Sequence, residues 1–107
     1  MHEFKNYSKI KAIINGKKYS LWVADDYQKM KKGLSGIDHL PSQSGMIFIY
    51  SNPVNNTFTM KKTKIPLEIS VLDSKFKVVD HHSCKPFQKD PVKSKKSYMF
   101  VIEIPGE

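Results

Sequence analysis

The side chains best suited to metal chemistry cluster between positions 80 and 84 of the chain. Zinc-binding residue types are found at Asp80, His81, His82 and Cys84 and, elsewhere in the chain, at His39. Neighbouring residues on a strand point to opposite faces of a sheet, so His81 and His82 cannot readily share one ion. His82 and Cys84 could do so, but no second spaced pair completes a tetrahedral set. We therefore predict no metal site and no cofactor, and interpret the cluster as a polar strand end that runs into a loop.

Cys84 is the one cysteine in the chain, and a thiol nucleophile would need a nearby histidine as its base. Nothing in the surrounding sequence indicates that the pKa of this thiol is lowered, so we interpret it as a free thiol near a loop. A lone cysteine cannot form an internal disulfide. This excludes a secreted scaffold held together by disulfides.

Three carboxylates, Glu68, Asp73 and Glu103, fall on expected strands or turns. Two of them could meet across a sheet and act as an acid and base pair. Sequence spacing does not establish such a meeting, and we expect solvated charges on strand faces instead. A small hydrolase or transferase that uses Cys84 or a carboxylate pair is kept as an alternative function.

The chain has a net charge of +8, which would attract nucleic acid through its phosphates. All 18 basic residues are lysine, however, and arginine is the usual choice for forked contacts to phosphate and guanine. Its absence argues against specific nucleic-acid recognition, and nonspecific binding through lysines is kept as a second alternative. The lysine-rich composition is typical of an AT-rich genome, cellular or viral.

A basic, partly apolar stretch occurs where Lys61, Lys62 and Lys64 follow Phe58 and Met60. Together with the lysines at positions 29, 31 and 32, this stretch could hold an anionic ligand. Lysines on strands also protect sheet edges against aggregation, and that structural interpretation is the simpler one.

The expected elements are mostly strands. Asn15 and Gly16 between residues 8–14 and 18–24 predict a β-hairpin, because both residue types tolerate positive φ. A short helix over residues 26–32 is expected to begin at an Asp25 cap and to end at Gly33. Further strands are predicted at 46–50, 58–60, 67–72, 76–80 and 98–104, and residues 83–96 are expected to form a mobile surface loop.

These elements predict a mainly β fold in one domain over residues 1–107. We expect a compact, antiparallel, barrel-like curled sheet of about seven strands with one short α-helix covering one opening. The predicted core consists of Ile13, Leu21, Val23, Leu34, Met46, Phe48, Phe58, Leu67, Ile69, Val71, Val78, Phe100 and Ile102.

Three segments, in order, resemble a known family. They are residues 32–36 (KGLSG) with 40–41 (LP) and 45–48 (GMIF), residues 58–72 (FTMKKTKIPLEISVL), and residues 98–106 (YMFVIEIPG). Their order and spacing are similar to those of the family called domain of unknown function 192, also known as uncharacterised protein family 0127. The resemblance implies a recognisable fold and no established activity. The family usually has a tryptophan where Thr59 stands and an asparagine where Lys62 stands.

Family members often carry an export or lipid-attachment signal, whereas residues 1–6 of this chain contain no apolar signal segment. No apolar run is long enough to cross a membrane, so we predict no membrane association and a cytoplasmic location in a bacterial or virus-infected cell.

The function that the sequence favours is a binding or accessory module without catalysis of its own. Its ligand site is predicted in a cleft around Met60, Lys61, Thr63 and Glu68, where family-like residues concentrate. The partner, a small molecule or a protein, is not specified by the sequence, and an anionic ligand would suit the lysines.

Overall fold

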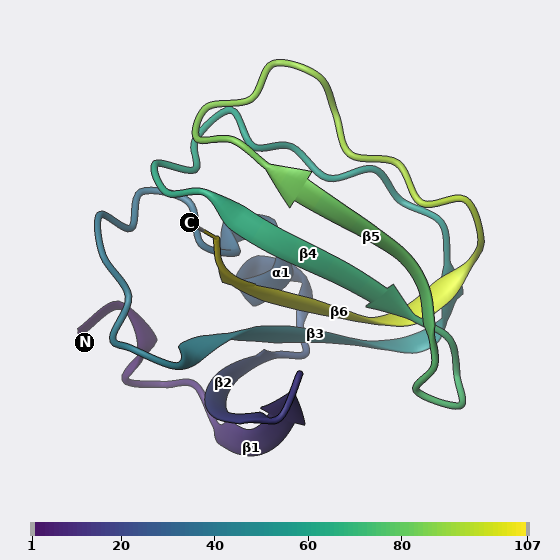
Figure 1. Ribbon diagram of the computed structural model, residues 1–107, viewed down its shortest axis with the longest axis horizontal. Helices are drawn as coiled ribbons and strands as arrows, with labels where there is room; N and C mark the ends of the chain where they lie inside the picture. The colour runs from purple at the N-terminus through teal and green to yellow at the C-terminus, as the bar shows by residue number, and fades with distance from the viewer. Residues whose placement is uncertain (1, 107) are drawn as a thin grey trace.

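The computed structural model describes residues 2–106 and is built around a six-stranded sheet with a short helix on one face (Figure 1). The strands are β1 (Lys9–Ile14), β2 (Lys17–Ala24), β3 (Ser44–Val54), β4 (Leu67–Leu72), β5 (Val78–Cys84) and β6 (Tyr98–Pro105). The helical segments are the 3-10 turn η1 (His2–Phe4) and the α-helix α1 (Tyr27–Lys32). The prediction of a mainly β fold with one short α-helix is confirmed within the described residues.

The strand order is β1-β2-β3-β6-β4-β5, so the sheet is curled but not closed into a barrel. All neighbours are antiparallel except β2 and β3, which pair in parallel from Ser20 opposite Ser44 to Ala24 opposite Phe48. The parallel pair arises because α1 and its following loop carry the chain back to the end at which β2 began. The strand expected at residues 58–60 is reduced to one bridge between Phe58 and Val92, which leaves six strands in residues 2–106.

The hairpin turn and the helix end lie where the sequence predicts, whereas the helix cap is displaced by one residue. Asn15 and Gly16 have φ of 50° and 79°, and they close the β1–β2 hairpin. The cap of α1 is Asp26 and not the expected Asp25: its side chain accepts a hydrogen bond of 2.8 Å from the backbone N–H of Lys29. Gly33 ends the helix with φ of 51°.

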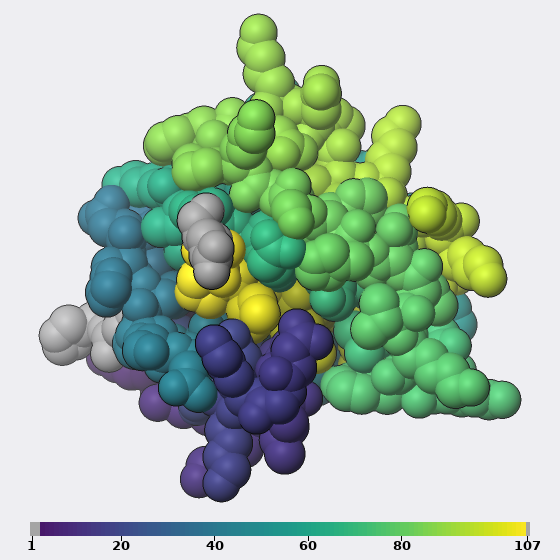
Figure 2. Space-filling model, viewed as in Figure 1, coloured from purple at the N-terminus to yellow at the C-terminus, as the bar shows by residue number. Residues whose placement is uncertain are grey.

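The sheet carries apolar clusters on both faces. The larger cluster packs under α1 and the loops and includes Met46, Ile69 and Val101, while the smaller one lies on the opposite face and includes Ile47 and Ile102. In Figure 2, the yellow surface of β6 is visible at the bottom of a gap between the purple β1 end and the green β5 side of the molecule. The curl of the sheet thus partly shields the second cluster.

The core prediction is correct for most positions and wrong at the sheet edges. Ile13 is 72% exposed and Val78 is 60% exposed, because each lies on an outer strand with no neighbour beyond it. Phe58 and Phe100 are half-buried. The predicted core also omits Phe4, which is buried and packs its ring 4.5 Å from that of Trp22.

The loop expected at residues 83–96 begins only after Cys84, because β5 extends to that residue, and the segment that follows is exposed over most of its length. It is nevertheless anchored at Val92, which is 3% exposed and exchanges two backbone hydrogen bonds of 2.9 Å with Phe58. Within residues 2–106, no helix has the length and apolar character that crossing a membrane requires.

Candidate ligand pocket

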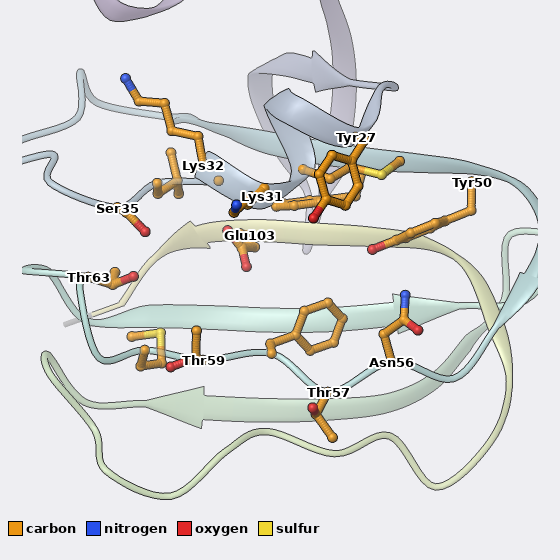
Figure 3. A pocket seen from close by; sticks show the side chains of 16 residues that line it. Tyr27, Lys31, Lys32, Ser35, Tyr50, Asn56, Thr57, Thr59, Thr63 and Glu103 are labelled. Atoms are coloured by element: carbon orange, nitrogen blue, oxygen red, sulfur yellow. The ribbon is translucent and has the colours of Figure 1, made fainter.

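A pocket of about 360 Å³ opens on the face of the sheet that α1 covers (Figure 3). One side is formed by α1 and the residues that follow it, and the other by residues 56–60 together with Thr63. Phe48 and Tyr50 on β3 and Glu103 on β6 also line it. Residues distant in sequence therefore meet here because β3 and β6 are neighbours in the sheet.

The acidic group of the pocket is Glu103, which is only 6% exposed. It lies opposite Met46 on β3 and Ile69 on β4, so its side chain shares the face of those core residues. Figure 3 shows its carboxylate directed into the space between the α1 side and the 56–60 side. No donor among residues 2–106 makes a hydrogen bond or ion pair with this carboxylate.

Burial raises the pKa of Glu103 to about 7, well above the ordinary value of 4.5. The carboxyl group therefore keeps its proton to a higher pH than an ordinary glutamate does, and it can accept a hydrogen bond when ionised or donate one when protonated. Tyr50 shares the pocket, and its pKa is raised chiefly by burial and further by the negative charge of Glu103.

The wall formed by residues 56–60 is fixed by a buried tyrosine. The Tyr98 hydroxyl donates to the backbone oxygen of Asn56 at 2.9 Å and accepts from its N–H at 3.1 Å. Burial raises the pKa of Tyr98 to about 12, so the hydroxyl keeps its proton at neutral pH. Together with the bridge between Phe58 and Val92, this contact holds the wall against the sheet.

The turn at residues 60–63 closes one end of the pocket. Met60 is 2% and Thr63 is 4% exposed, and the N–H of Thr63 donates to the oxygen of Met60 at 3.0 Å. The N–H of Gly36 donates to the oxygen of Lys62 at 2.9 Å. The turn is thus tied to the loop that follows α1.

Two lysines of α1, Lys31 and Lys32, line the mouth of the pocket. Neither has a carboxylate of residues 2–106 within ion-pair distance, whereas Lys29 lies 3.6 Å from Asp26 on the same helix. The Nζ atom of Lys31 lies 5.9 Å from the ring centre of Tyr27. A shallower hollow adjoins the mouth and is also lined by Lys31, Lys32 and Lys62. This entrance is therefore positively charged, while the interior carries an acid.

The four residues of the predicted cleft separate in the structure. Met60 and Thr63 line the pocket, whereas the exposed Lys61 does not. Glu68 is next to Ile69 on β4 and points to the opposite face of the sheet from Glu103. The expected solvated position is wrong for Glu103, because α1 and the 56–60 segment cover its side of β6.

In the sequence, the feature that could have identified Glu103 as a pocket residue is its position as a carboxylate within the otherwise apolar residues 101–104. Tyr50 and Asn56 gave no comparable signal. They reach the pocket only through the pairing of β3 with β6 and the contact of Asn56 with Tyr98.

The histidine and cysteine cluster lies outside the pocket. Among residues 2–106, no group of three or more His, Cys, Asp or Glu side chains is placed to hold a metal ion. His82 instead approaches Asp80 at 3.0 Å. Cys84 is 4% exposed, and its pKa is raised by burial and by the charges of Glu103 and Glu68.

A polar network on the exposed side of β4 and β5 was not predicted. The Ser70 hydroxyl lies 2.9 Å from Nδ1 of His81, and Nε2 of that ring lies 2.7 Å from the carboxylate of Glu68. Ser83 donates to the same carboxylate at 2.8 Å. Serine, histidine and glutamate in this order are the group types of a hydrolase triad. The side chains of His81 and Glu68 are 47% and 35% exposed, and neither lines the pocket.

The sequence model of the family DUF192, described as Uncharacterized ACR, COG1430, matches residues 10–107. The chain belongs to this family. Membership in DUF192 confirms the resemblance that the three sequence segments indicate. All three segments contribute pocket residues: Lys32 and Phe48 are among those from the first, Met60 and Thr63 come from the second, and Glu103 from the third. Thr59, where DUF192 sequences usually have a tryptophan, also lines the pocket.

Two solved structures are similar to this DUF192 chain. A protein of unknown function from Novosphingobium aromaticivorans DSM 12444 has a TM-score of 0.80 and 24% identity, covering 94% of this chain and 74% of that one. A protein from Sinorhizobium meliloti 1021, named "a putative transcription regulator", has a TM-score of 0.78 and 22% identity, covering 94% of this chain and 82% of that one. A search of curated proteins gives no match. At these identities, the similarities establish a shared fold.

Proposed function

We propose that this DUF192 chain is a small ligand-binding module without catalysis of its own, and that its ligand occupies the pocket over Glu103. The supporting observation is a concave site of about 360 Å³ in which polar groups from α1, β6 and the 56–63 segment converge on an apolar interior. Such sites are the usual location of small-molecule binding. The proposed site keeps Met60 and Thr63 from the sequence prediction and adds Glu103, Lys31 and Lys32.

The lysines at the mouth support a ligand that carries an anionic group. Lys31 and Lys32 stand in the last turn of α1, where lysine also complements the negative end of the helix dipole. Their lack of ion pairs within the described residues leaves both ammonium groups free to contact a ligand.

Calorimetric titration and thermal-shift screening with anionic metabolites and sugars test the proposal. The double variant Lys31→Glu/Lys32→Glu should weaken binding of an anionic ligand by tenfold or more. The matched control is Lys17→Glu/Lys18→Glu, which changes the net charge equally at exposed positions outside the pocket and should leave affinity unchanged. No response across a broad panel, or equal losses in both double variants, would contradict a ligand site here.

A hydrolase is the second candidate, and the network of Ser70, His81 and Glu68 is the observation that favours it. Its open position on paired strands provides no enclosed site, which is why this candidate ranks second. The measurement is turnover of p-nitrophenyl acetate by the wild type, Ser70→Ala and the control Ser97→Ala. Hydrolysis that disappears only in Ser70→Ala would establish the activity, and equal slow rates in all three proteins would remove it.

Nonspecific nucleic-acid binding through lysines is the third candidate, and the name of the Sinorhizobium structure is compatible with it. Retention on duplex or single strands that falls steeply with salt would support this candidate, and no retention at low salt would end it. The cytoplasmic location and the viral or AT-rich cellular origin stay predictions.

A further inference from the structure

Glu103 is the acidic side chain of the pocket, and it is buried there beside Thr63. Its side chain is 6% exposed, points into the pocket, and receives no hydrogen bond or ion pair from residues 2–106. Its oxygen atoms are not fully enclosed, so a ligand in the pocket can reach them, and their partial burial penalises the ionised form until a partner is bound. The chain has 18 lysines, two of them at the mouth of the same pocket, yet none lies within 4.0 Å of this group.

The surroundings of Glu103 suit a positively charged partner. Tyr50, Phe58 and Phe48 line the same pocket, and the faces of aromatic rings attract cations. An ammonium group placed among these rings would form an ion pair with the carboxylate and gain from the rings at the same time. A hydroxyl group would supply a hydrogen bond but would leave the negative charge uncompensated.

The mouth of the pocket has the opposite charge. Lys31 and Lys32 line it, and neither is neutralised by a carboxylate of the described residues. A ligand that reaches from Glu103 to this mouth therefore meets a negative group at one end and positive groups at the other. The volume of about 360 Å³ is near the lower end of the ~300–1,000 Å³ range of ligand pockets, which suits a molecule of amino-acid size.

We propose that the pocket binds a small amino-acid zwitterion, with the ammonium group against Glu103 and the carboxylate toward Lys31 and Lys32. This inference rests on the proposed ligand-binding function and adds the chemical class of the ligand. Apolar contacts with Phe58 and Met60 would favour a ligand with an aromatic or aliphatic side chain.

The test begins with calorimetric titration of the full chain with each of the twenty standard amino acids. The tightest binder is then compared with two analogues, the carboxylic acid that lacks its amino group and the amine that lacks its carboxylate. For phenylalanine these are 3-phenylpropanoate and 2-phenylethylamine. We expect each analogue to bind at least tenfold more weakly than the amino acid.

Two variants test which pocket residues contact the ammonium end of the ligand and which contact its carboxylate end. Glu103→Gln should lose tenfold or more in affinity for the amino acid and no longer distinguish it from the acid lacking the amino group. Lys31→Gln/Lys32→Gln should no longer distinguish it from the amine. Glu3→Gln repeats the first substitution at an exposed position outside the pocket and should change nothing. Circular dichroism establishes that each variant is folded.

The outcomes separate this inference from the proposed function. The proposal of a zwitterionic ligand is overturned if no amino acid binds, or if the amino acid and its analogue without the amino group bind equally. If an anionic metabolite or sugar then binds and Lys31→Glu/Lys32→Glu weakens it, the ligand site stands with another ligand class. If nothing binds in either series, both proposals fail.

Discussion

Glu103 occupies a position on β6 where an apolar side chain would satisfy the packing. Its neighbours across the sheet are Met46 and Ile69, both completely buried. A carboxyl group here lowers the stability of the folded chain whenever it is ionised, because burial penalises the charge. At the residue scale, this cost supports the proposal that Glu103 contacts a ligand.

Glu103 makes the stability of the protein depend on pH in a distinctive direction. Its pKa is about 7 when folded and 4.5 ordinarily, so between these values the folded chain binds more protons than the unfolded chain. Stability should therefore fall as pH rises through this window, by on the order of 3 kcal/mol in all. The lowered pKa values of Glu68, Asp73 and Asp80 act in the opposite direction and at more acidic pH.

Glu103→Gln should remove this decline and be more stable than the wild type at pH 8. Urea unfolding at several pH values between 4.5 and 8 measures the effect. Glu3→Gln, at an exposed position, should keep the wild-type pH dependence. A decline that persists unchanged in Glu103→Gln would show that the group is not ionising in this range.

Cys84 should react slowly with thiol reagents. Its side chain is buried, and its pKa is raised by burial and by nearby carboxylates, so little thiolate forms at neutral pH. Labelling by iodoacetamide at pH 7 should be at least tenfold slower than that of free cysteine. Labelling faster than free cysteine would instead support the thiol version of the enzyme hypothesis.

At the scale of elements, the segment 56–60 has almost no regular structure of its own, yet it forms one wall of the pocket. It depends on two long-range contacts, the Tyr98 hydroxyl at Asn56 and the backbone bridge between Phe58 and Val92. The loop after β5 thus helps to position the pocket even though it does not line it.

Tyr98→Phe removes both hydrogen bonds to Asn56 and should destabilise the protein by about 1–3 kcal/mol. The wall should also loosen, so the amides of residues 56–58 should exchange hydrogen faster than in the wild type. Urea unfolding and hydrogen exchange measure the two effects. Tyr19→Phe, on β2 outside the pocket, is the control and should alter neither. Unchanged exchange in Tyr98→Phe would mean that the hydroxyl does not hold the wall.

For the whole molecule, the two apolar clusters are linked because they share strands. Met46 and Ile47 are neighbours on β3 but belong to different clusters, and the same holds for Val101 and Ile102 on β6. Loss of one cluster would therefore disrupt the strands that carry the other. We expect residues 1–107 to unfold as a single domain.

Ile47→Ala and Leu67→Ala remove side chains from different clusters, and each should cost about 2–5 kcal/mol. Both variants should unfold in one transition, with Trp22 fluorescence and far-ultraviolet circular dichroism giving the same midpoint. Ile13→Ala, at a position that is 72% exposed, is the control and should have little effect. Separate midpoints for the two probes would contradict the single-domain prediction.

The sequence by itself determined the features that depend on nearby residues. Asn15 and Gly16 specify the hairpin turn, Gly33 ends the helix, and the alternation of Leu67, Ile69 and Val71 specifies a strand with one buried face. The three family segments likewise identified DUF192. The turn, helix-end and strand signals are local, because turn geometry and strand periodicity act over a few residues, whereas the family match depends on the order and spacing of segments along the chain.

Only the tertiary structure decided which strands pair and what covers them. The parallel contact of β2 with β3, the exposure of Ile13 and Val78 on the outer strands, and the burial of Glu103 all depend on this arrangement. So does the separation of Glu68 from the pocket, since one step along β4 reverses the face. Burial is set by the segments that pack on a strand, and these come from distant parts of the chain, which local periodicity does not specify.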